Sequence, residues 1–179
     1  ERVLLHEDPG RVAALFLEPV VGSNGVIVYP EGYLEGVRAV CDRYGILLVF
    51  DEVMTGFGRV GAAFAEERFG VVPDLITFAK GVTSAYVPLG GVLVREGLAR
   101  AFDETPLPTG HTYSGHPLAV AAGLAALEAY REEGLLERAR RLETFFREAL
   151  RALEAHPWVG EVRGLGAFYG VELVRDRRT

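Results

Sequence analysis

ILLVFDE, residues 46–52, is an apolar run that ends in two acidic residues, and LITFAKG, residues 75–81, is a second apolar run that ends in a lysine. Short, continuous apolar runs of this length are typical of buried strands. A charge that directly follows such a strand is poorly solvated unless it has a partner or a ligand. In open α/β sheets, ligands bind beyond the carboxyl ends of the strands. The two runs therefore predict neighbouring strands whose terminal charges, Asp51 and Lys80, face one binding site.

Lys80 is the only lysine in the chain, and every other side-chain cation apart from histidine is an arginine. An arginine stays charged and is a poor nucleophile, whereas a lysine amine becomes nucleophilic when burial or a nearby cation lowers its pKa. The position of this single lysine at the end of a buried strand makes it the first candidate for covalent chemistry.

The composition excludes several classes of protein. The chain has 179 residues, 49% hydrophobic and 25% charged, which is ordinary for a soluble globular domain and not for a disordered chain. A net charge of −6 without a basic cluster argues against binding to nucleic acid. No apolar stretch approaches the roughly 20 residues that span a bilayer, and no signal peptide is visible, so we expect a cytoplasmic protein. The single Cys41 fits a reducing compartment and is expected to pack in the core.

Strands and helices alternate in the first two thirds of the chain. Further strands are expected at residues 12–17 and 90–95, a helix from Gly32 to Tyr44 that Gly45 terminates, and a short helix at 63–69. Continuous rather than alternating apolarity in the strands indicates a sheet covered by helices on both faces. The predicted fold class is α/β.

The texture of the sequence changes after Pro117. Residues 118–157 carry helical stripes and are expected to form long connecting helices. Residues 162–174, rich in glycine among apolar residues, are expected to form a strand that opens a small C-terminal domain. Residues 1–117 would be part of a large domain and residues 158–179 the beginning of the small one. Because that second domain has no room to finish, we expect the chain to be a fragment.

Four ordered motifs resemble the signature of class III aminotransferases, the ω-aminotransferase group of fold type I pyridoxal-phosphate enzymes. The resemblance covers essentially the whole chain and implies the mostly parallel sheet of the large domain of that fold. The motifs are Glu18-Pro19-Val20, the run from Phe50 to Arg59, the run from Pro73 to Gly81, and the run from Gly110 to Pro117.

The resemblance assigns the two strand-terminal charges to one cofactor. Lys80 would be linked to the aldehyde of pyridoxal 5'-phosphate and, once displaced by the amino substrate, would move the proton between substrate and cofactor carbons. Asp51 would accept a hydrogen bond from the pyridine nitrogen and keep it protonated. The alternatives are a surface lysine after a strand and an aspartate that caps a helix.

Three more residues are carried over from the family as cofactor-binding residues. Val53 would pack on the pyridine face if the chain stays extended, although plain core packing explains it nearly as well. Glu18 would lie near the cofactor, or be a surface carboxylate at a strand end. Thr112 would bond the cofactor phosphate of the neighbouring subunit, which implies a homodimer with shared active sites. Taken alone, Thr112 is only a loop hydroxyl.

Two positions differ from the ornithine and 4-aminobutyrate branch of the family. Ser23 stands where that branch has a glutamate that masks a substrate-binding arginine, and Met54 stands where it has a glutamine. Both resemble the branch that uses pyruvate as amino acceptor and takes ω-amino acids or amines as donors. The implied activity is transamination from such a donor to a keto acid, with pyruvate expected as the acceptor.

Other functions stay open or are set aside. The same scaffold serves aminomutases and decarboxylases, and the chain could also be a non-catalytic remnant. The phosphate-binding loop and the substrate-carboxylate arginine of the family have no counterpart here. Gly56-Phe57-Gly58 lacks the third glycine of a nucleotide-binding loop. His111 and His116 have no Cys, Asp or Glu beside them at ligand spacing, so no metal site is expected.

Overall fold

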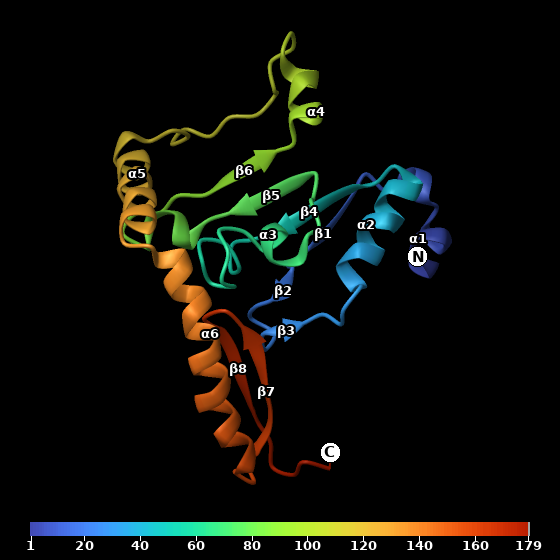
Figure 1. The fold of residues 1–179 in the computed structure, drawn as a ribbon. Coiled ribbons are helices and arrows are strands. Elements are labelled where there is room, and N and C mark those ends of the chain that lie inside the picture. Colours follow the sequence, from blue (N-terminus) through green and yellow to red (C-terminus); the bar gives the residue numbers. More distant parts are fainter. Residues whose placement is uncertain (179) are drawn as a thin grey trace.

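The computed structural model describes residues 1–178, and Figure 1 shows the order of their helices and strands. The strands are β1 (Ala14–Leu17), β2 (Val20–Val21), β3 (Ile27–Val28), β4 (Leu47–Asp51), β5 (Leu75–Phe78), β6 (Gly91–Val94), β7 (Val159–Leu165) and β8 (Phe168–Leu173). The α-helices are α1 (Arg2–Glu7), α2 (Tyr33–Tyr44), α3 (Ala65–Phe69), α4 (Glu96–Ala99), α5 (Pro117–Glu132) and α6 (Leu135–Arg151). Short 3-10 turns are η1 (Pro9–Arg11), η2 (Lys80–Thr83), η3 (Arg100–Phe102) and η4 (Ala152–Ala155).

The central sheet has four strands in the order β1-β4-β5-β6. β4 runs parallel to both β1 and β5, and β6 pairs antiparallel with β5. The register places Asp51 of β4 opposite Thr77 of β5. The carboxyl ends of the two predicted strands therefore lie side by side, and the α/β class is confirmed.

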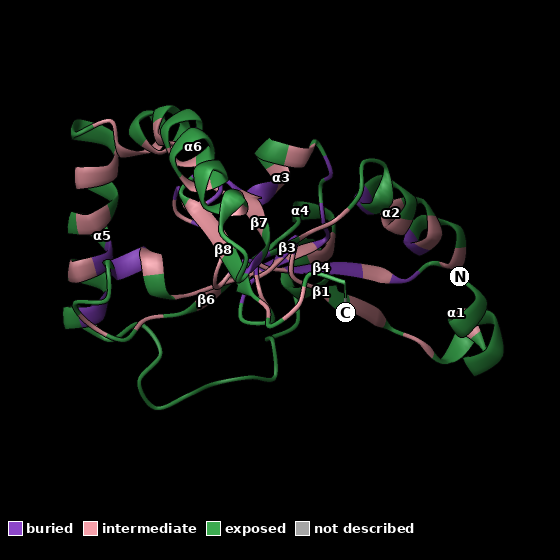
Figure 2. Ribbon diagram, turned by 90° about the horizontal axis from the view of Figure 1, so that it is seen from below, coloured by how far each residue is buried: buried purple, intermediate pink, exposed green. Residues whose placement is uncertain are grey.

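One face of this sheet forms the main core. Leu48, Phe50 and Ile76 are at most 5% exposed and pack with Leu34 and Cys41 of α2. Full burial of side chains of this size stabilises the fold by about 1.5–3 kcal/mol each. In Figure 2 the buried colour is concentrated in β4, whereas α5 and α6 are mostly exposed. Cys41 is fully buried, and burial raises the pKa of its thiol, so the packing interpretation is confirmed.

Within residues 1–178 the opposite face of the sheet is less covered. Phe16 and Val49 are register partners on that face, yet Phe16 is 69% exposed. Val92 and Val94 of β6 align with the same face and are also exposed. The helices of the described residues thus bury the α2 side of the sheet far better than its other side.

The expected helix from Gly32 to Tyr44 corresponds to α2, which the sequence terminates as predicted. Gly45 has a φ of 67°, and its N–H donates to the carbonyls of Asp42 and Cys41. Only glycine adopts this left-handed conformation without a steric cost, so the helix ends there. The chain then enters β4 directly, which delivers Asp51 to the carboxyl end of the sheet.

Two boundaries near the site differ from the sequence-based expectation. β4 extends through Asp51, so this aspartate is the last residue of the strand rather than the first beyond it. β5 ends at Phe78, one residue earlier than expected. Both strand ends remain adjacent, because Glu52 N donates to Thr77 O at 2.8 Å.

The prediction of one strand at residues 162–174 was wrong. That segment belongs to the antiparallel hairpin of β7 and β8, with Gly166 at its turn in a left-handed conformation (φ 61°). A continuous apolar run hid the turn, since its only signal was the glycine. The hairpin lies beside α6 below the central sheet (Figure 1). The helices expected at residues 118–157 also end earlier, because α6 ends at Arg151 and a 3-10 turn follows.

None of the helices within residues 1–178 combines the length and apolarity needed to cross a membrane.

Candidate functional site

Lys80 opens the 3-10 turn η2, immediately after β5 and Ala79. Its backbone has a φ of 46°, and Ser84 and Ala85 in the following loop are also left-handed. Such conformations cost of order 1–3 kcal/mol for residues other than glycine, and they cluster at functional sites. The Lys80 side chain is exposed, and its Nζ lies 2.7 Å from the Met54 Sδ. No carboxylate within residues 1–178 forms an ion pair with this amine.

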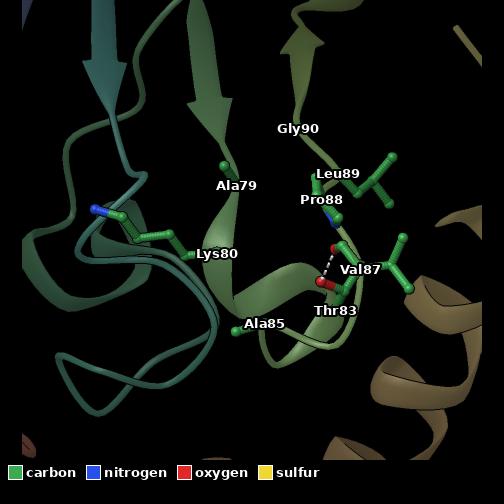
Figure 3. A pocket seen from close by; sticks show the side chains of 8 residues that line it. All are labelled: Ala79, Lys80, Thr83, Ala85, Val87, Pro88, Leu89 and Gly90. Atoms are coloured by element: carbon green, nitrogen blue, oxygen red, sulfur yellow. Dashed lines mark hydrogen bonds between the residues drawn. The ribbon is translucent and has the colours of Figure 1, made fainter. Parts of the chain in front are cut away.

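A cavity of about 570 Å³ lies next to Lys80 and is lined by residues of the segment from Ala79 to Gly90. Its wall is mostly apolar and includes Val87, Pro88 and Leu89. In Figure 3 the Lys80 side chain runs away from these residues, toward the end of β4. The Thr83 hydroxyl donates to Val87 O at 2.6 Å and closes the loop. The Lys80 amine therefore points toward the end of β4 and away from Val87, Pro88 and Leu89 (Figure 3).

Asp51 stands at the end of β4 and is partly buried, and no cation within residues 1–178 forms an ion pair with its carboxylate. Its Oδ1 accepts a hydrogen bond from Val53 N at 3.1 Å. Its Oδ2 has no hydrogen-bond partner among residues 1–178. No hydrogen bond or ion pair joins Asp51 to Lys80 within residues 1–178. The structure thus places an amine and a carboxylate on adjacent strand ends, and each can still form a hydrogen bond or an ion pair with a ligand.

The loop after Asp51 does not stay extended. A turn begins at Val53, so the alternation that would place Val53 on the side of Asp51 is lost. The turn removes the extended-chain argument for Val53, whose side chain is partly buried, so its contact with the cofactor ring stays a prediction. The turn brings the next residue, Met54, to the Lys80 amine.

Glu18 is linked to the site through Met54. Its Oε2 accepts a hydrogen bond from Gly22 N at 2.9 Å, which links the end of β1 to the start of the turn after β2. Gly22 packs so closely on the Met54 side chain that a Cβ there would lie 2.9 Å from Met54 Cγ. Glu18 therefore shapes the surface on which Met54 rests.

Thr112 is not brought to the other candidates. It lies exposed in the segment between η3 and α5, and its hydroxyl makes no hydrogen bond within residues 1–178. Ser23 is exposed as well, in the turn between β2 and β3.

Glu52 is a further important residue of the site, and the sequence pattern did not indicate its role. It is fully buried and accepts hydrogen bonds from Ala65 N, at 2.7 and 2.9 Å, and from the Thr55 hydroxyl at 2.9 Å. Burial raises the pKa of this carboxyl to about 7, although those hydrogen bonds act to lower it. Glu52 holds the first N–H of α3 and fixes the loop that carries Val53 and Met54. A second carboxylate directly after a buried strand was the available signal.

The raised pKa of Glu52 predicts a pH-dependent stability. The folded-state pKa lies above the unfolded value, so the contribution of Glu52 is fully present below about pH 4.5 and is lost as the pH rises through about 7. The free energy of unfolding falls by about 3 kcal/mol at most over this pH range. We expect the melting temperature of Glu52→Gln, relative to that of the parent chain, to rise as the pH increases from 5 to about 8. Thermal denaturation of both proteins across this range measures it, and a constant difference would contradict the assignment.

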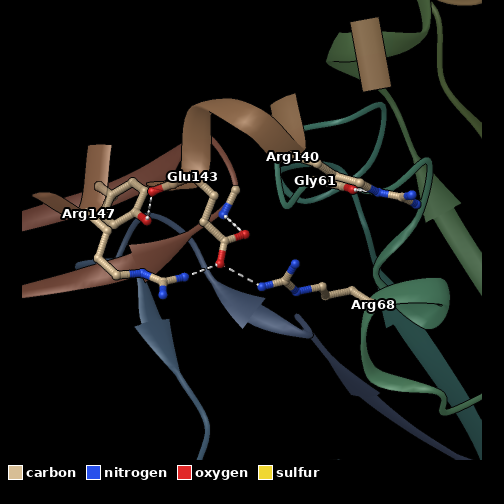
Figure 4. Close-up of polar contacts among 7 residues, drawn as sticks. Gly61, Arg68, Arg140, Glu143 and Arg147 are labelled. Atoms are coloured by element: carbon tan, nitrogen blue, oxygen red, sulfur yellow. Dashed lines mark hydrogen bonds and ion pairs between the residues drawn. The ribbon is translucent and has the colours of Figure 1, made fainter. Parts of the chain in front are cut away.

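Glu143 of α6 is a second buried carboxylate, and the sequence did not reveal its partners (Figure 4). Its Oε1 pairs with Arg68 of α3 at 2.8 Å and with Arg147 at 2.5 Å, and its Oε2 accepts from Gly166 N at 3.0 Å. Burial alone would raise the pKa of Glu143, but hydrogen bonds from Arg68 and Gly166 reverse this and lower it. Glu143 therefore ties α6 and the β7–β8 turn to α3.

The family model described as aminotransferase class-III matches residues 1–179. An omega-aminotransferase of Caulobacter vibrioides is 52% identical over 178 residues, covering 97% of this chain and 40% of the relative.

Solved structures of transaminases have the same fold. An (S)-enantioselective omega-transaminase from Thermomicrobium roseum superposes with a TM-score of 0.94 at 46% identity, over 99% of this chain and 40% of that one. A taurine:2-oxoglutarate aminotransferase from Bifidobacterium kashiwanohense, solved with PLP and glutamate, gives a TM-score of 0.96 at 48% identity, with the same coverage. The chain thus spans about two fifths of the length of these relatives.

Proposed function

The chain belongs to the class III aminotransferase family, and we propose that it contributes the lysine and the aspartate of a pyridoxal-phosphate-dependent transaminase. The single observation that carries this proposal is the pair of strand ends. They present, at the same edge of the sheet, the only lysine of the chain and a carboxylate with one oxygen unpaired within residues 1–178.

The residues at this edge fit the cofactor of the family. Lys80 has an exposed amine without a carboxylate partner in residues 1–178, on a strained backbone. Asp51 Oδ2 is free to accept a hydrogen bond from a protonated ring nitrogen. When bound, pyridoxal phosphate supplies an aldehyde carbon for amines and a ring that withdraws electrons.

The protein side of the mechanism follows from these positions. Lys80 Nζ would hold the cofactor and, after displacement by the amino substrate, take the proton from the substrate carbon and return it at the cofactor carbon. The Asp51 carboxylate would keep the proton on the ring nitrogen. Val53 would pack on the ring, and Glu18 would act through Gly22 and Met54.

We further propose that the active enzyme is a homodimer in which Thr112 binds the cofactor phosphate of the partner subunit. The exposed, unpartnered hydroxyl of Thr112 supports this, because nothing in residues 1–178 uses it. Residues 1–117 would then be part of the large domain, residues 118–157 the connection, and residues 158–179 the start of the small domain. Cytoplasmic residence stays a prediction.

The proposed substrates are an ω-amino acid or amine as donor and pyruvate as acceptor. Ser23 stands where the ornithine and 4-aminobutyrate branch has the glutamate that masks a substrate-binding arginine. Ser23 lies exposed. The acceptor differs among relatives, since the Bifidobacterium enzyme is named for 2-oxoglutarate.

The half-reactions test both the function and the acceptor. The chain loaded with pyridoxal phosphate should lose its visible absorbance when 3-aminopropanoate is added and regain it when a keto acid follows. We expect pyruvate to restore it at least about tenfold faster than 2-oxoglutarate. Faster recovery with 2-oxoglutarate would refute the acceptor assignment. Product formed without any keto acid would favour an aminomutase or a decarboxylase, and a folded chain that never acquires colour would favour a non-catalytic remnant.

A further inference from the structure

We propose that Arg59 binds the carboxylate group of the substrate, an ω-amino acid or a keto acid, beside Lys80. This inference deepens the function proposed above and rests on it. Nothing in the sequence pattern assigned a substrate role to this arginine.

The side chains of Arg59 and Lys80 both lie close to one sulfur atom, the Sδ of Met54. Lys80 Nζ lies 2.7 Å from Met54 Sδ, and Arg59 Nη1 lies 3.9 Å from the same atom. A short substrate with an amino group at one end and a carboxylate at the other is about as long as the separation of these two nitrogen atoms. Its amino end would react at Lys80 while its carboxylate faces Arg59. The guanidinium thus stands within reach of a short ω-amino acid or a keto acid.

Within residues 1–178 the Arg59 guanidinium has no anionic partner. Neither an aspartate nor a glutamate of residues 1–178 pairs with it, whereas Arg68, Arg140 and Arg163 all form ion pairs. Its contacts are the Met54 sulfur and the Phe168 ring, whose centroid is 5.8 Å from Cζ. A partly buried guanidinium with five N–H donors is under-satisfied by a weak sulfur acceptor and a ring face. A carboxylate is the group that it binds best.

The backbone around Arg59 is fixed, so its position is prepared before a ligand arrives. Arg59 O accepts a hydrogen bond from Ala167 N at 2.9 Å, and the neighbouring Gly61 O accepts from Arg140 Nε at 2.6 Å (Figure 4). Gly166 packs so tightly on this loop that a Cβ there would lie 2.4 Å from the Val60 carbonyl carbon. A fixed cation loses less entropy on binding than a free surface arginine.

Met54 keeps the guanidinium available. A thioether is a poor hydrogen-bond acceptor, whereas a glutamine carbonyl at this position would compete for the Arg59 donors. Met54→Gln should therefore weaken carboxylate binding in the same direction as loss of Arg59. The competing interpretation is that Arg59 only anchors the β7–β8 hairpin through Phe168, which predicts a stability effect without selectivity for carboxylates.

The test compares Arg59→Met with the matched control Arg141→Met, which removes an exposed arginine of α6. Spectral titration of the chain loaded with pyridoxal phosphate gives apparent affinities for 3-aminopropanoate and for propylamine, which lacks the carboxylate. We expect Arg59→Met to weaken 3-aminopropanoate about 10- to 100-fold and to leave propylamine unchanged, as for a lost charged hydrogen bond. Equal effects on both probes, or none on either, would overturn the proposal.

A second measurement needs no cofactor. In the chain labelled with ¹⁵N-arginine, the Nε–H resonance of Arg59 is assigned by its disappearance in Arg59→Met. Propanoate should shift it saturably, more weakly in Met54→Gln and unchanged in Arg141→Met. An unshifted resonance overturns the assignment of Arg59 even if the chain binds pyridoxal phosphate. A chain that shows the shift but acquires no colour instead contradicts the proposed function of Lys80.

Discussion

Lys80→Ala is expected to abolish both the visible absorbance that pyridoxal phosphate gives with this chain and all measurable amino-group transfer. The chain has no second lysine to take over, so no other side-chain amine can link the aldehyde. Loss of a positioned proton-transfer group alone costs about 10²- to 10⁴-fold in rate. Difference absorption spectra and single-turnover kinetics measure the two effects.

The control for Lys80→Ala is Lys80→Arg, which keeps the positive charge but lacks a nucleophilic amine. Both variants should lose the absorbance if covalent attachment at Lys80 is its source. Both should keep a melting temperature close to that of the parent chain, because the side chain is exposed and its one side-chain hydrogen bond within residues 1–178 is to Met54. Absorbance that survives in either variant would show that the cofactor is attached elsewhere.

Glu143→Ala is expected to lower the free energy of unfolding by about 2–4 kcal/mol. The substitution leaves the buried Gly166 N–H without its acceptor and deprives Arg68 and Arg147 of their shared partner. For a chain of this size, the melting temperature should fall by about 4–16 °C. Calorimetry or thermal circular dichroism measures it.

Glu148→Ala is the matched control for Glu143→Ala, because it removes an exposed carboxylate from the same helix. Its effect should stay within about 0.5 kcal/mol. Equal melting temperatures for the two variants would show that the cluster around Glu143 contributes no stability. Because the β7–β8 turn also holds the Arg59 loop, Glu143→Ala should in addition weaken the propanoate shift of Arg59.

The sequence predicted the parts of the fold that depend on local patterns. The run from Ile46 to Phe50 identified β4, since continuous apolarity over a short length is typical of a strand in a covered sheet. The helix α2 and its end were predictable from the spacing of Leu34 and Cys41 and from Gly45. Because parallel strands end at one edge, the neighbourhood of Asp51 and Lys80 followed from the same reasoning.

The sequence did not predict features that depend on contacts between distant residues. Glu143 resembles any acidic residue of an exposed helix until Arg68, 75 residues earlier, is folded against it. The turn at Gly166 was hidden because apolar residues flank it on both sides. Arg59 lay within a quoted motif, but its proximity to Lys80 depends on the turn at Val53, where an extended chain was expected. Tertiary packing decided each of these positions.

Reductive labelling tests the central claim most directly. The purified chain is mixed with pyridoxal phosphate and treated with borohydride, which converts a carbon–nitrogen double bond into a stable amine, and its peptides are analysed by mass spectrometry. The chain offers only two primary amines, Lys80 and the amino terminus. We expect one stoichiometric label on the peptide that contains Lys80, and its loss in Lys80→Arg. A label found only at the amino terminus, or no label on a folded chain, would contradict the role of Lys80.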